Sequence, residues 1–233
     1  MLVLAVASRQ RVEVQIAKDP LADLLVEHER VLRLMPEASV LIVSADPERV
    51  ERDLAAGAVG CPDCGGVLAR WGHARARAVR AEQSAPIWLR PRRARCGSCA
   101  RSHVLLPDLV LLRRVDVVAV IGSALLLAAE GLGHRRVARA LGRPAETVRD
   151  WLRRARERAE RIRVHFSAWA HALDPLLAPL EPGTSALADG VEAMASAARA
   201  AQLRLGRRPV WSFVSAMTAG ALLSNTNSPW PAP

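Results

Sequence analysis

The sequence predicts a mainly α protein with a small β zinc ribbon, in which a three-helix helix-turn-helix domain is followed by a helical C-terminal region. Three patterns lead to this fold class. The four cysteines of the chain form two C-x-x-C pairs, a spacing typical of a zinc ribbon. A helix-turn-helix pattern follows them, and apolar seams with heptad spacing come after it. The 233 residues suffice for one sizeable domain or for two to three small ones.

These patterns divide the chain into consecutive segments. They are an N-terminal extension (1–38), a strand–helix lead-in (39–60), the zinc ribbon (61–106), the helix-turn-helix domain (113–165), the helical C-terminal region (166–223) and a disordered tail (224–233). Because Met35 offers a later start, residues 1–34 are interpreted as an extension from an early gene start that need not belong to the native protein. Residues 1–6 lack the basic start and the length of a signal peptide.

The lead-in predicts a strand followed by a helix. Val40–Val43 has the composition of a buried strand. Asp46 is expected to cap a helix that has Pro47 at its first position, since proline needs no hydrogen-bond acceptor there. The helix should run to about Ala56 and end at Gly57.

The ribbon is predicted to hold zinc through Cys61, Cys64, Cys96 and Cys99. Each C-x-x-C turn aims two thiolates at one point, and two turns complete the tetrahedral S4 set that suits zinc. Gly65, after the second cysteine, allows the tight turn. Two disulfides or four incidental thiols are the alternatives, but a cytosolic chain keeps its thiols reduced.

Two strand-like pieces, 67–79 and 87–95, lie between the cysteine pairs. Because so short a ribbon buries little apolar area, the metal should replace its missing core. Arg92 and Arg93 are expected to face nucleic-acid phosphates, with a merely solvated position as the alternative. Since four cysteines already fill the tetrahedron, the two spare histidines are expected at the polar surface or at phosphates; they are His73 and His103.

A helix-turn-helix pattern spans residues 134–153, after a helix predicted at 116–130. Gly142 is expected to end the first helix in the left-handed conformation, and Pro144 to lie in the first turn of the second. The shared core is predicted to contain Val137, Leu141, Val148, Trp151 and Leu152. An ordinary helical hairpin with a solvated basic face is the alternative.

The second helix of this pattern is the predicted recognition helix, which would enter the major groove. The residues on its outer face or N-terminal end, where base edges would be read, are Ala145, Glu146, Thr147, Arg149, Asp150 and Arg153. The residues better placed for phosphates are Arg135, Arg136, Arg143 and Arg154.

Two heptad seams extend beyond the recognition helix. The first is Val148, Leu152, Ala155, Ala159, Ile162, Phe166, Trp169 and Leu173, and the second is Leu187, Val191, Met194, Ala198, Ala201 and Leu205. We expect them to pack on each other within one chain, because alanine-rich seams are weak in two-stranded coils. The alternative is a homodimer that pairs two recognition helices on a palindromic site. A last helix is predicted over 210–223, with Trp211, Val214 and Met217 facing the core.

The charge of the chain is concentrated in one block. The formal net charge is +10 and the pI is about 11.2. Residues 61–163 contain 22 arginines and 9 acidic residues, a net of +13, so the remainder of the chain carries −3. Such a block favours a polyanionic partner, although a GC-rich genome would also enrich arginine over lysine. The longest apolar run, 117–129, is too short to span a bilayer, so a cytoplasmic protein is expected.

Three stretches resemble an uncharacterised bacterial family of zinc-ribbon plus helix-turn-helix proteins encoded near integrase-type transposases. They are the Cys61–Gly65 knuckle, the Arg92–Cys99 knuckle and the stretch from Gly133 to Arg154. The ribbon is also similar to the N-terminal zinc ribbon of insertion-sequence transposases. The resemblance covers about residues 40–223 and implies transposon-end or operator DNA binding. Unlike full transposases, the chain has no catalytic-domain pattern after Arg163, where its acidic residues are Asp174, Glu181, Asp189 and Glu192.

The function predicted from the sequence is therefore non-enzymatic, sequence-specific binding of double-stranded DNA by a zinc-containing protein. It would be a transposition accessory protein or a transcriptional regulator, and the sequence leaves both open. A zinc-ribbon adaptor that binds a transposase is the main alternative. A nuclease or transposase with an unrecognised active site is the third hypothesis.

Overall fold

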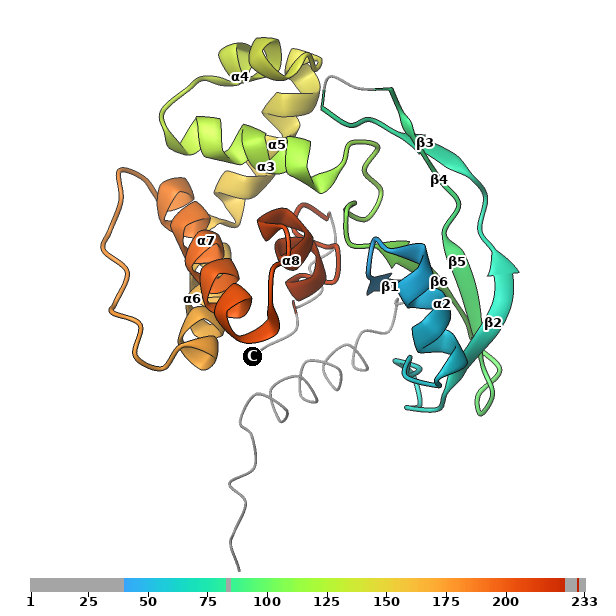
Figure 1. Cartoon of the computed structure of the whole chain (residues 1–233). Helices are drawn as coiled ribbons and strands as arrows, with labels where there is room; N and C mark the ends of the chain where they lie inside the picture. The colour runs from blue at the N-terminus through green and yellow to red at the C-terminus, as the bar shows by residue number, and fades with distance from the viewer. Residues whose placement is uncertain (1–39, 83–84, 225–229, 231–233) are drawn as a thin grey trace, which may run out of the picture.

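The computed structural model describes residues 40–82, 85–224 and 230 of the chain (Figure 1). A small β region lies beside a larger helical body. The predicted extension, the proposed later start at Met35 and most of the predicted tail lie outside the described residues. No helix in the described ranges is long and apolar enough to cross a membrane.

The β region is a four-stranded sheet with the strand order β1-β6-β5-β2. Its strands are β1 (Val40–Val43), β2 (Leu68–His73), β5 (Arg92–Cys96) and β6 (Ser102–Pro107). β1 runs parallel to β6, while β5 is antiparallel to both β6 and β2. The predicted lead-in strand is therefore an edge strand of the sheet that carries the second cysteine pair.

A two-stranded hairpin, β3 (Arg77–Val79) with β4 (Ile87–Leu89), continues the ribbon toward the helices (Figure 1). The predicted piece at 67–79 is thus divided between β2 and β3, and the piece at 87–95 between β4 and β5. The register of β2 on β5 shifts between Arg70 and His73. This irregularity lies at the end of β2 that leads into the hairpin.

Helix α2 (Pro47–Ala55) packs on one face of the sheet and confirms the predicted helix start. The side chain of Asp46 accepts a hydrogen bond from the N–H of Glu48 at 3.0 Å, and Pro47 occupies the first turn. The helix ends before Gly57, which has a left-handed φ of +69°. Its buried residues join a small core that consists of Leu41, Val50, Leu54, Cys61, Leu68, Ala94, Cys96 and Leu105.

The helical body contains the remaining helices. They are α3 (Val118–Ala129), α4 (His134–Leu141), α5 (Ala145–Glu157), α6 (Ala159–Leu173), α7 (Ala186–Leu205) and α8 (Val210–Met217). Their common core includes the fully buried side chains of Trp151, Phe166 and Trp169. Val79 and Leu89 of the hairpin also belong to it, so the ribbon is anchored on the helices.

The two heptad seams pack on each other within the chain, as expected. Every residue of the first seam is buried. Close approach of α6 and α7 requires Gly190, because a Cβ atom there would lie 3.2 Å from Cγ2 of Ile162 and 3.3 Å from the carbonyl oxygen of Ala159. The second seam ends earlier than predicted, since Leu205 is exposed. Because every residue of the first seam is buried within this chain, the first seam is not free to pair with a second copy.

Two sequence expectations for the helices were wrong. The recognition helix does not continue unbroken into the first seam, because Arg158, with φ −116° and ψ 7°, separates α5 from α6. The last helix ends at Met217, short of the predicted Leu223. In the expected disordered tail, the described residue Trp230 is buried, and its Nε1–H donates to the carbonyl oxygen of Ala221 at 3.3 Å.

Candidate metal centre and nucleic-acid interface

Two matching turns hold the cysteines. The N–H of Gly65 donates to the carbonyl oxygen of Cys61 at 2.8 Å, and the N–H of Ala100 donates to that of Cys96 at 3.1 Å. Both donors have left-handed backbone, with φ +74° at Gly65 and +60° at Ala100. Glycine adopts this conformation freely, whereas alanine is strained by its Cβ atom. The second turn therefore stores strain that the first avoids.

The four cysteines converge as a tetrahedral metal site requires. Their Sγ atoms all lie within 4.8 Å of one another. The Sγ atoms of Cys61 and Cys99 are 3.7 Å apart, and those of Cys64 and Cys96 are 3.4 Å apart. A zinc ion about 2.3 Å from each sulfur would separate the sulfurs by about 3.8 Å. The set fits zinc, and the distances exclude disulfide bonds, which are about 2.05 Å long.

The cysteines differ in how readily they give up a proton. The N–H groups of Cys99 and Ser98 donate to Sγ of Cys96 at 3.5 and 3.3 Å. They lower the pKa of the Cys96 thiol from 9.0 to about 6. Burial raises the pKa of the Cys61 thiol to about 12. Cys96 therefore offers a thiolate at neutral pH, whereas a metal must displace the proton of Cys61.

His103 lies against the cysteine site, contrary to its expected place at the surface or at phosphates. It is buried on β6, with Nε2 at 3.4 Å from Sγ of Cys61 and 3.5 Å from Oδ2 of Asp63. Cys61, Asp63 and His103 also satisfy the distances of a metal-ligand group. The alternation of β6 could have indicated this burial, because His103 and the buried Leu105 lie on one face.

The two ribbon arginines predicted to face phosphates lie on opposite faces of β5. Arg92 points toward α2, where its Nε lies 2.9 Å from Oε1 of Glu51. Arg93 donates from Nη2 to Oγ of Ser102 at 2.9 Å. Arg95, which sequence reasoning left out, is exposed on the face of Arg93 and lies over the ring of Trp71. The period-two alternation of the strand would have found it.

The helix-turn-helix has the predicted geometry. Gly142 caps α4 with φ +61°, and its N–H donates to the carbonyl oxygens of the preceding turn. Pro144 lies at the N-cap of α5, one position before the predicted first turn. The predicted core residues Val137, Val148, Trp151 and Leu152 are buried, and the remaining one, Leu141, is partly buried. Pro144 provides no side-chain cap, so the first N–H groups of α5 have no side-chain acceptor at the cap.

Arg143 has an internal role in place of the predicted phosphate contact. Its side chain is only 10% exposed, and its Nε lies 2.6 Å from Oδ1 of Asp116. Its Nη2 donates to the carbonyl oxygen of Ala81 at 2.7 Å. Asp116, 1% exposed, also accepts from Nη2 of Arg80 at 2.7 Å. This buried carboxylate joins the ribbon to the helix-turn-helix, and no local sequence pattern indicated it.

The outer face of α5 carries arginines that are paired with acidic residues of the same helix. Arg149 forms an ion pair with Glu146, one turn before it. Arg153 donates to Oε1 of Glu157 at 2.7 Å and lies 3.4 Å from Oδ1 of Asp150. Each of these side chains is about half exposed or more. The predicted base-reading face is therefore exposed but nearly neutral in the free protein.

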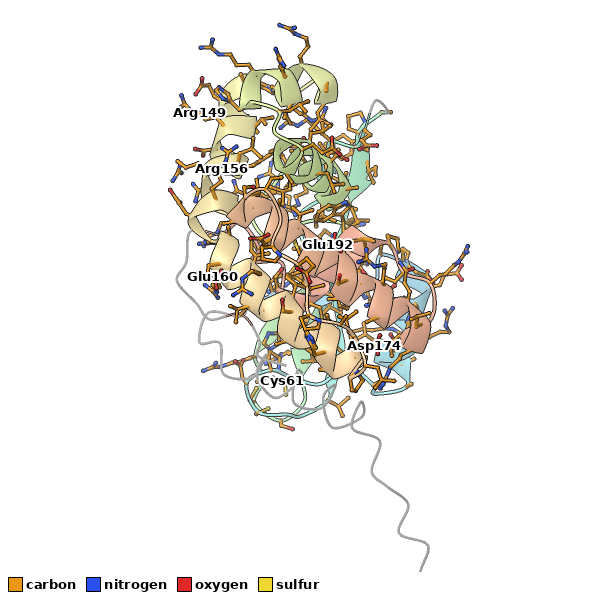
Figure 2. The ribbon with its side chains drawn as sticks, turned by 90° about the vertical axis from the view of Figure 1, so that its left-hand side faces the viewer. Cys61, Arg149, Arg156, Glu160, Asp174 and Glu192 are labelled. Atoms are coloured by element: carbon orange, nitrogen blue, oxygen red, sulfur yellow. The ribbon has the colours of Figure 1, made fainter. Side chains whose placement is uncertain are left out.

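The other predicted contacts on α5 are less accessible. Arg154 is 17% exposed and lies 3.7 Å from Oδ2 of Asp150. Ala145 and Thr147, in the first turn, are partly buried. Arg156, absent from the predicted set, is exposed and extends outward together with Arg149 in Figure 2. The accessible part of α5 is thus its solvent-facing row, which the helical period defines.

The clearest unpaired basic surface lies on α4. Arg135, Arg136 and Arg139 are exposed, and among the described residues none of them has a carboxylate within ion-pair distance. Arg135 and Arg136 belong to the predicted phosphate contacts, and Arg139 extends the same surface by one turn. We call these three residues the α4 arginines. They provide positive charge beside the near-neutral face of α5.

The cysteine site and the helix-turn-helix lie at opposite ends of the molecule. Figure 1 places α4 and α5 at the top and β2 with β5 at the lower right, and Figure 2, turned about the vertical axis, places Cys61 at the bottom. The β3–β4 hairpin extends between them. The basic block of the sequence is therefore spread over the length of the molecule rather than gathered at one site.

Comparisons with known proteins identify two segments. Residues 118–163 match the family model described as a homeodomain-like domain. This range covers α3, α4, α5 and the start of α6, and it supports the helix-turn-helix and a DNA-binding surface on it. Residues 61–129 match a domain of unknown function (DUF6431), which spans the ribbon and α3. No curated protein and no solved structure matches the chain.

Proposed function

We propose that this chain is a zinc-containing, sequence-specific DNA-binding protein without catalytic activity, which acts as a transposition accessory protein or a transcriptional regulator. The observation that carries the proposal is the helix pair α4–α5. It combines the geometry of a helix-turn-helix, the homeodomain-like match and the exposed α4 arginines. Zinc, when bound by the four cysteines, supplies the fold of the ribbon.

In the proposed complex, α5 enters the major groove and the α4 arginines contact phosphates. Arg149 suits bidentate contacts to guanine, and the carboxylate of Glu146 can accept from the amino group of cytosine. In the free protein these two side chains form an ion pair with each other. Base contacts must compete with this pair, so only a sequence that offers partners to both side chains favours opening it. The neutral face of α5 thereby favours binding of a specific base sequence over sequence-independent electrostatic attraction to DNA.

The first experiment selects bound sequences from random duplex DNA with the zinc-loaded protein. Arg149→Ala should weaken specific binding by about 1–3 kcal/mol and relax the preference at one position. Arg135→Ala should weaken binding to all sequences and reduce the slope of the salt dependence by about one. Arg204→Ala, which removes an exposed arginine from α7, is the matched control and should change neither. Selection of no sequence above random would contradict the proposal.

A protein-binding adaptor remains the second candidate, because the ribbon has exposed apolar side chains, including Trp71 and Trp88. Capture of a transposase by the purified chain without DNA, together with no salt-dependent DNA binding, would favour it.

The proposal that the chain is not an enzyme rests on the placement of its C-terminal acids. Asp174, Glu181, Asp189 and Glu192 form no metal-ligand group within the described chain. Metal-dependent cleavage of DNA would contradict it.

A further inference from the structure

The outer face of the four-stranded sheet carries an exposed tryptophan in contact with an arginine. α2 covers the inner face, on which Leu68, Ala94 and Cys96 are buried. On the outer face Ala69 lies opposite Arg95 in the β2–β5 register. Trp71, two residues further along β2, is 52% exposed. The guanidinium carbon of Arg95 lies 4.7 Å from the centroid of the Trp71 ring.

The hairpin exposes a second tryptophan on a firmly held strand. Trp88 on β4 lies opposite Ala78 on β3 and is 74% exposed. Its chain neighbour Leu89 and the β3 residue Val79 are buried in the helical core. Because these neighbours anchor both strands, Trp88 stands on a fixed backbone. We call Trp71 and Trp88, together with the exposed ribbon arginines Arg75, Arg90 and Arg95, the tryptophan face.

The charge of the ribbon matches a polyanion. Residues 67–101 contain nine arginines and a single acidic residue, Glu82. Arg70 and Arg92 pair with Glu51, Arg80 pairs with Asp116, and Arg101 pairs with Asp63. The arginines for which the described chain has no ion pair are Arg75, Arg77, Arg90, Arg93 and Arg95. An apolar protein partner would leave this charge unmatched, whereas a nucleic-acid strand would neutralise it.

We propose that the tryptophan face binds an unpaired stretch of DNA, with bases stacked on Trp71 and Trp88 and phosphates on the neighbouring arginines. Open tryptophan rings among arginines are the features that bind single strands, since every base offers a ring face for stacking. In a duplex the base faces are covered, so a duplex cannot use both rings. This inference rests on the proposed function in one respect only, namely that the partner is DNA.

The hairpin also lies close to the duplex-binding end. The N–H of Arg80 donates to the carbonyl oxygen of Val115, and the N–H of Val117 donates to that of Arg80. The buried ion pairs of Asp116 join the same segment to the turn before α5. A strand that leaves a duplex held on α4 and α5 would therefore meet the hairpin first and β2 next (Figure 1). The preferred ligand is a duplex with a single-stranded extension.

The test measures binding of the zinc-loaded full chain to oligothymidylate, to a blunt duplex and to the same duplex with a thymidine overhang. Trp71→Ala and Trp88→Ala should each weaken binding to oligothymidylate about tenfold and remove the advantage of the overhang. Binding to the blunt duplex should stay unchanged. Trp71→Phe and Trp88→Phe should retain most of the affinity. Leu203→Ala, on an exposed apolar residue of α7, is the control and should have no effect.

Tryptophan fluorescence provides a direct readout. Of the remaining tryptophans, Trp151, Trp169 and Trp230 are buried and Trp211 is partly buried. Oligothymidylate should therefore quench mainly Trp71 and Trp88, and the double alanine variant should lose the quenching. Zinc content and the circular dichroism spectrum should not change, because both side chains are exposed.

Several results would overturn the inference. The inference is wrong if wild-type protein binds oligothymidylate no more tightly than the double alanine variant. It is also wrong if the alanine variants lose the same affinity for the blunt duplex as for the overhanging one. Loss of transposase capture by the double variant, with all DNA binding intact, would assign the face to a protein.

The two proposals fail separately. Arg149→Ala and Arg135→Ala address duplex binding and should leave binding to oligothymidylate intact.

Discussion

The ribbon end and the helical end of this chain are stabilised by different means. The core beneath α2 contains eight buried residues, two of which are the cysteines Cys61 and Cys96. The core of the helical body contains 38 buried residues in the described chain, among them Trp151, Phe166 and Trp169. An apolar core as small as the first does not by itself offset the loss of chain entropy. The comparison predicts that metal binding at the four cysteines stabilises one end, whereas apolar packing stabilises the other.

Removal of zinc should have the largest effect on stability, and it should unfold the ribbon end without unfolding the helical end. Metal binding by structural cysteine sites contributes about 10–16 kcal/mol, far more than the small core can replace. A strong chelator, or Cys96→Ser, should unfold the ribbon while α3 to α8 keep their helical signal. Hydrogen exchange resolved by segment would measure this. Ser98→Ala, in the same turn but outside the ligand set, is the control. Cooperative loss of all helices on chelation would contradict the comparison.

Acidification should release the metal and unfold the same end. The pKa of Cys96 is lowered from 9.0 to about 6 in the folded chain. Its thiolate therefore stabilises the folded ribbon fully above pH 9, and this contribution is lost as the pH falls through about 6. Zinc affinity should decrease steeply over the same range, because protons compete for all four sulfurs. A metal-indicator titration between neutral pH and pH 5 measures the effect, and pH-independent affinity would refute it.

Asp116→Ala should weaken the junction between the two ends. The substitution leaves Arg143, 10% exposed, without its carboxylate, and it releases Arg80 of the ribbon. Breaking a buried pair from one side costs about 3 kcal/mol, which urea unfolding would measure. Asp150→Ala removes a carboxylate that is 47% exposed and its ion pairs on α5, and it should cost less than about 1 kcal/mol. Equal effects of the two substitutions would show that Asp116 does not join the ends.

The smallest effect is expected from a substitution that relieves the backbone strain in the second cysteine turn. Ala100 has φ +60°, so Ala100→Gly should stabilise the ribbon by about 1 kcal/mol. Zinc affinity should then rise about fivefold. Gly65→Ala, at the matching position with φ +74°, should lower the affinity by a similar factor. A competition titration with a chelator compares the three proteins, and a change of the same sign in both variants would contradict the explanation.

Features set by short-range geometry were predictable from the sequence. The turns around Cys61 and Cys96, the cap of α2 and the left-handed Gly142 all follow from neighbouring residues. The heptad spacing also predicted that α6 and α7 would pack together, because it places apolar side chains on one face of each helix. The deviations were small: the helix ends near Arg158 and Met217, the exposed Leu205 of the second seam, and Pro144, which is the N-cap of α5.

Features that depend on distant segments were not predictable. The parallel pairing of β1 with β6 joins strands more than fifty residues apart, and no periodicity specifies it. Arg143 and Arg149 look alike in the sequence, but only Arg143 faces the buried carboxylate of Asp116. Arg92 lies on the same face of β5 as the buried Ala94, and only the packing of α2 on that face brings its Nε within 2.9 Å of Oε1 of Glu51. Whether each predicted DNA contact is accessible therefore depends on the tertiary surroundings of that side chain.

The sequence by itself determined the two C-x-x-C turns, the helix-turn-helix and the excess of positive charge. Each is a property of residue types at short spacings, which fix local backbone geometry and local charge. Only the tertiary structure decided that the cysteine site and the helix-turn-helix lie at opposite ends (Figures 1 and 2). It also decided that Trp71 and Trp88 of the ribbon are exposed. The reason is that burial and distance depend on which segments pack together, and here the hairpin and the ion pairs of Asp116 join the ribbon to the helices.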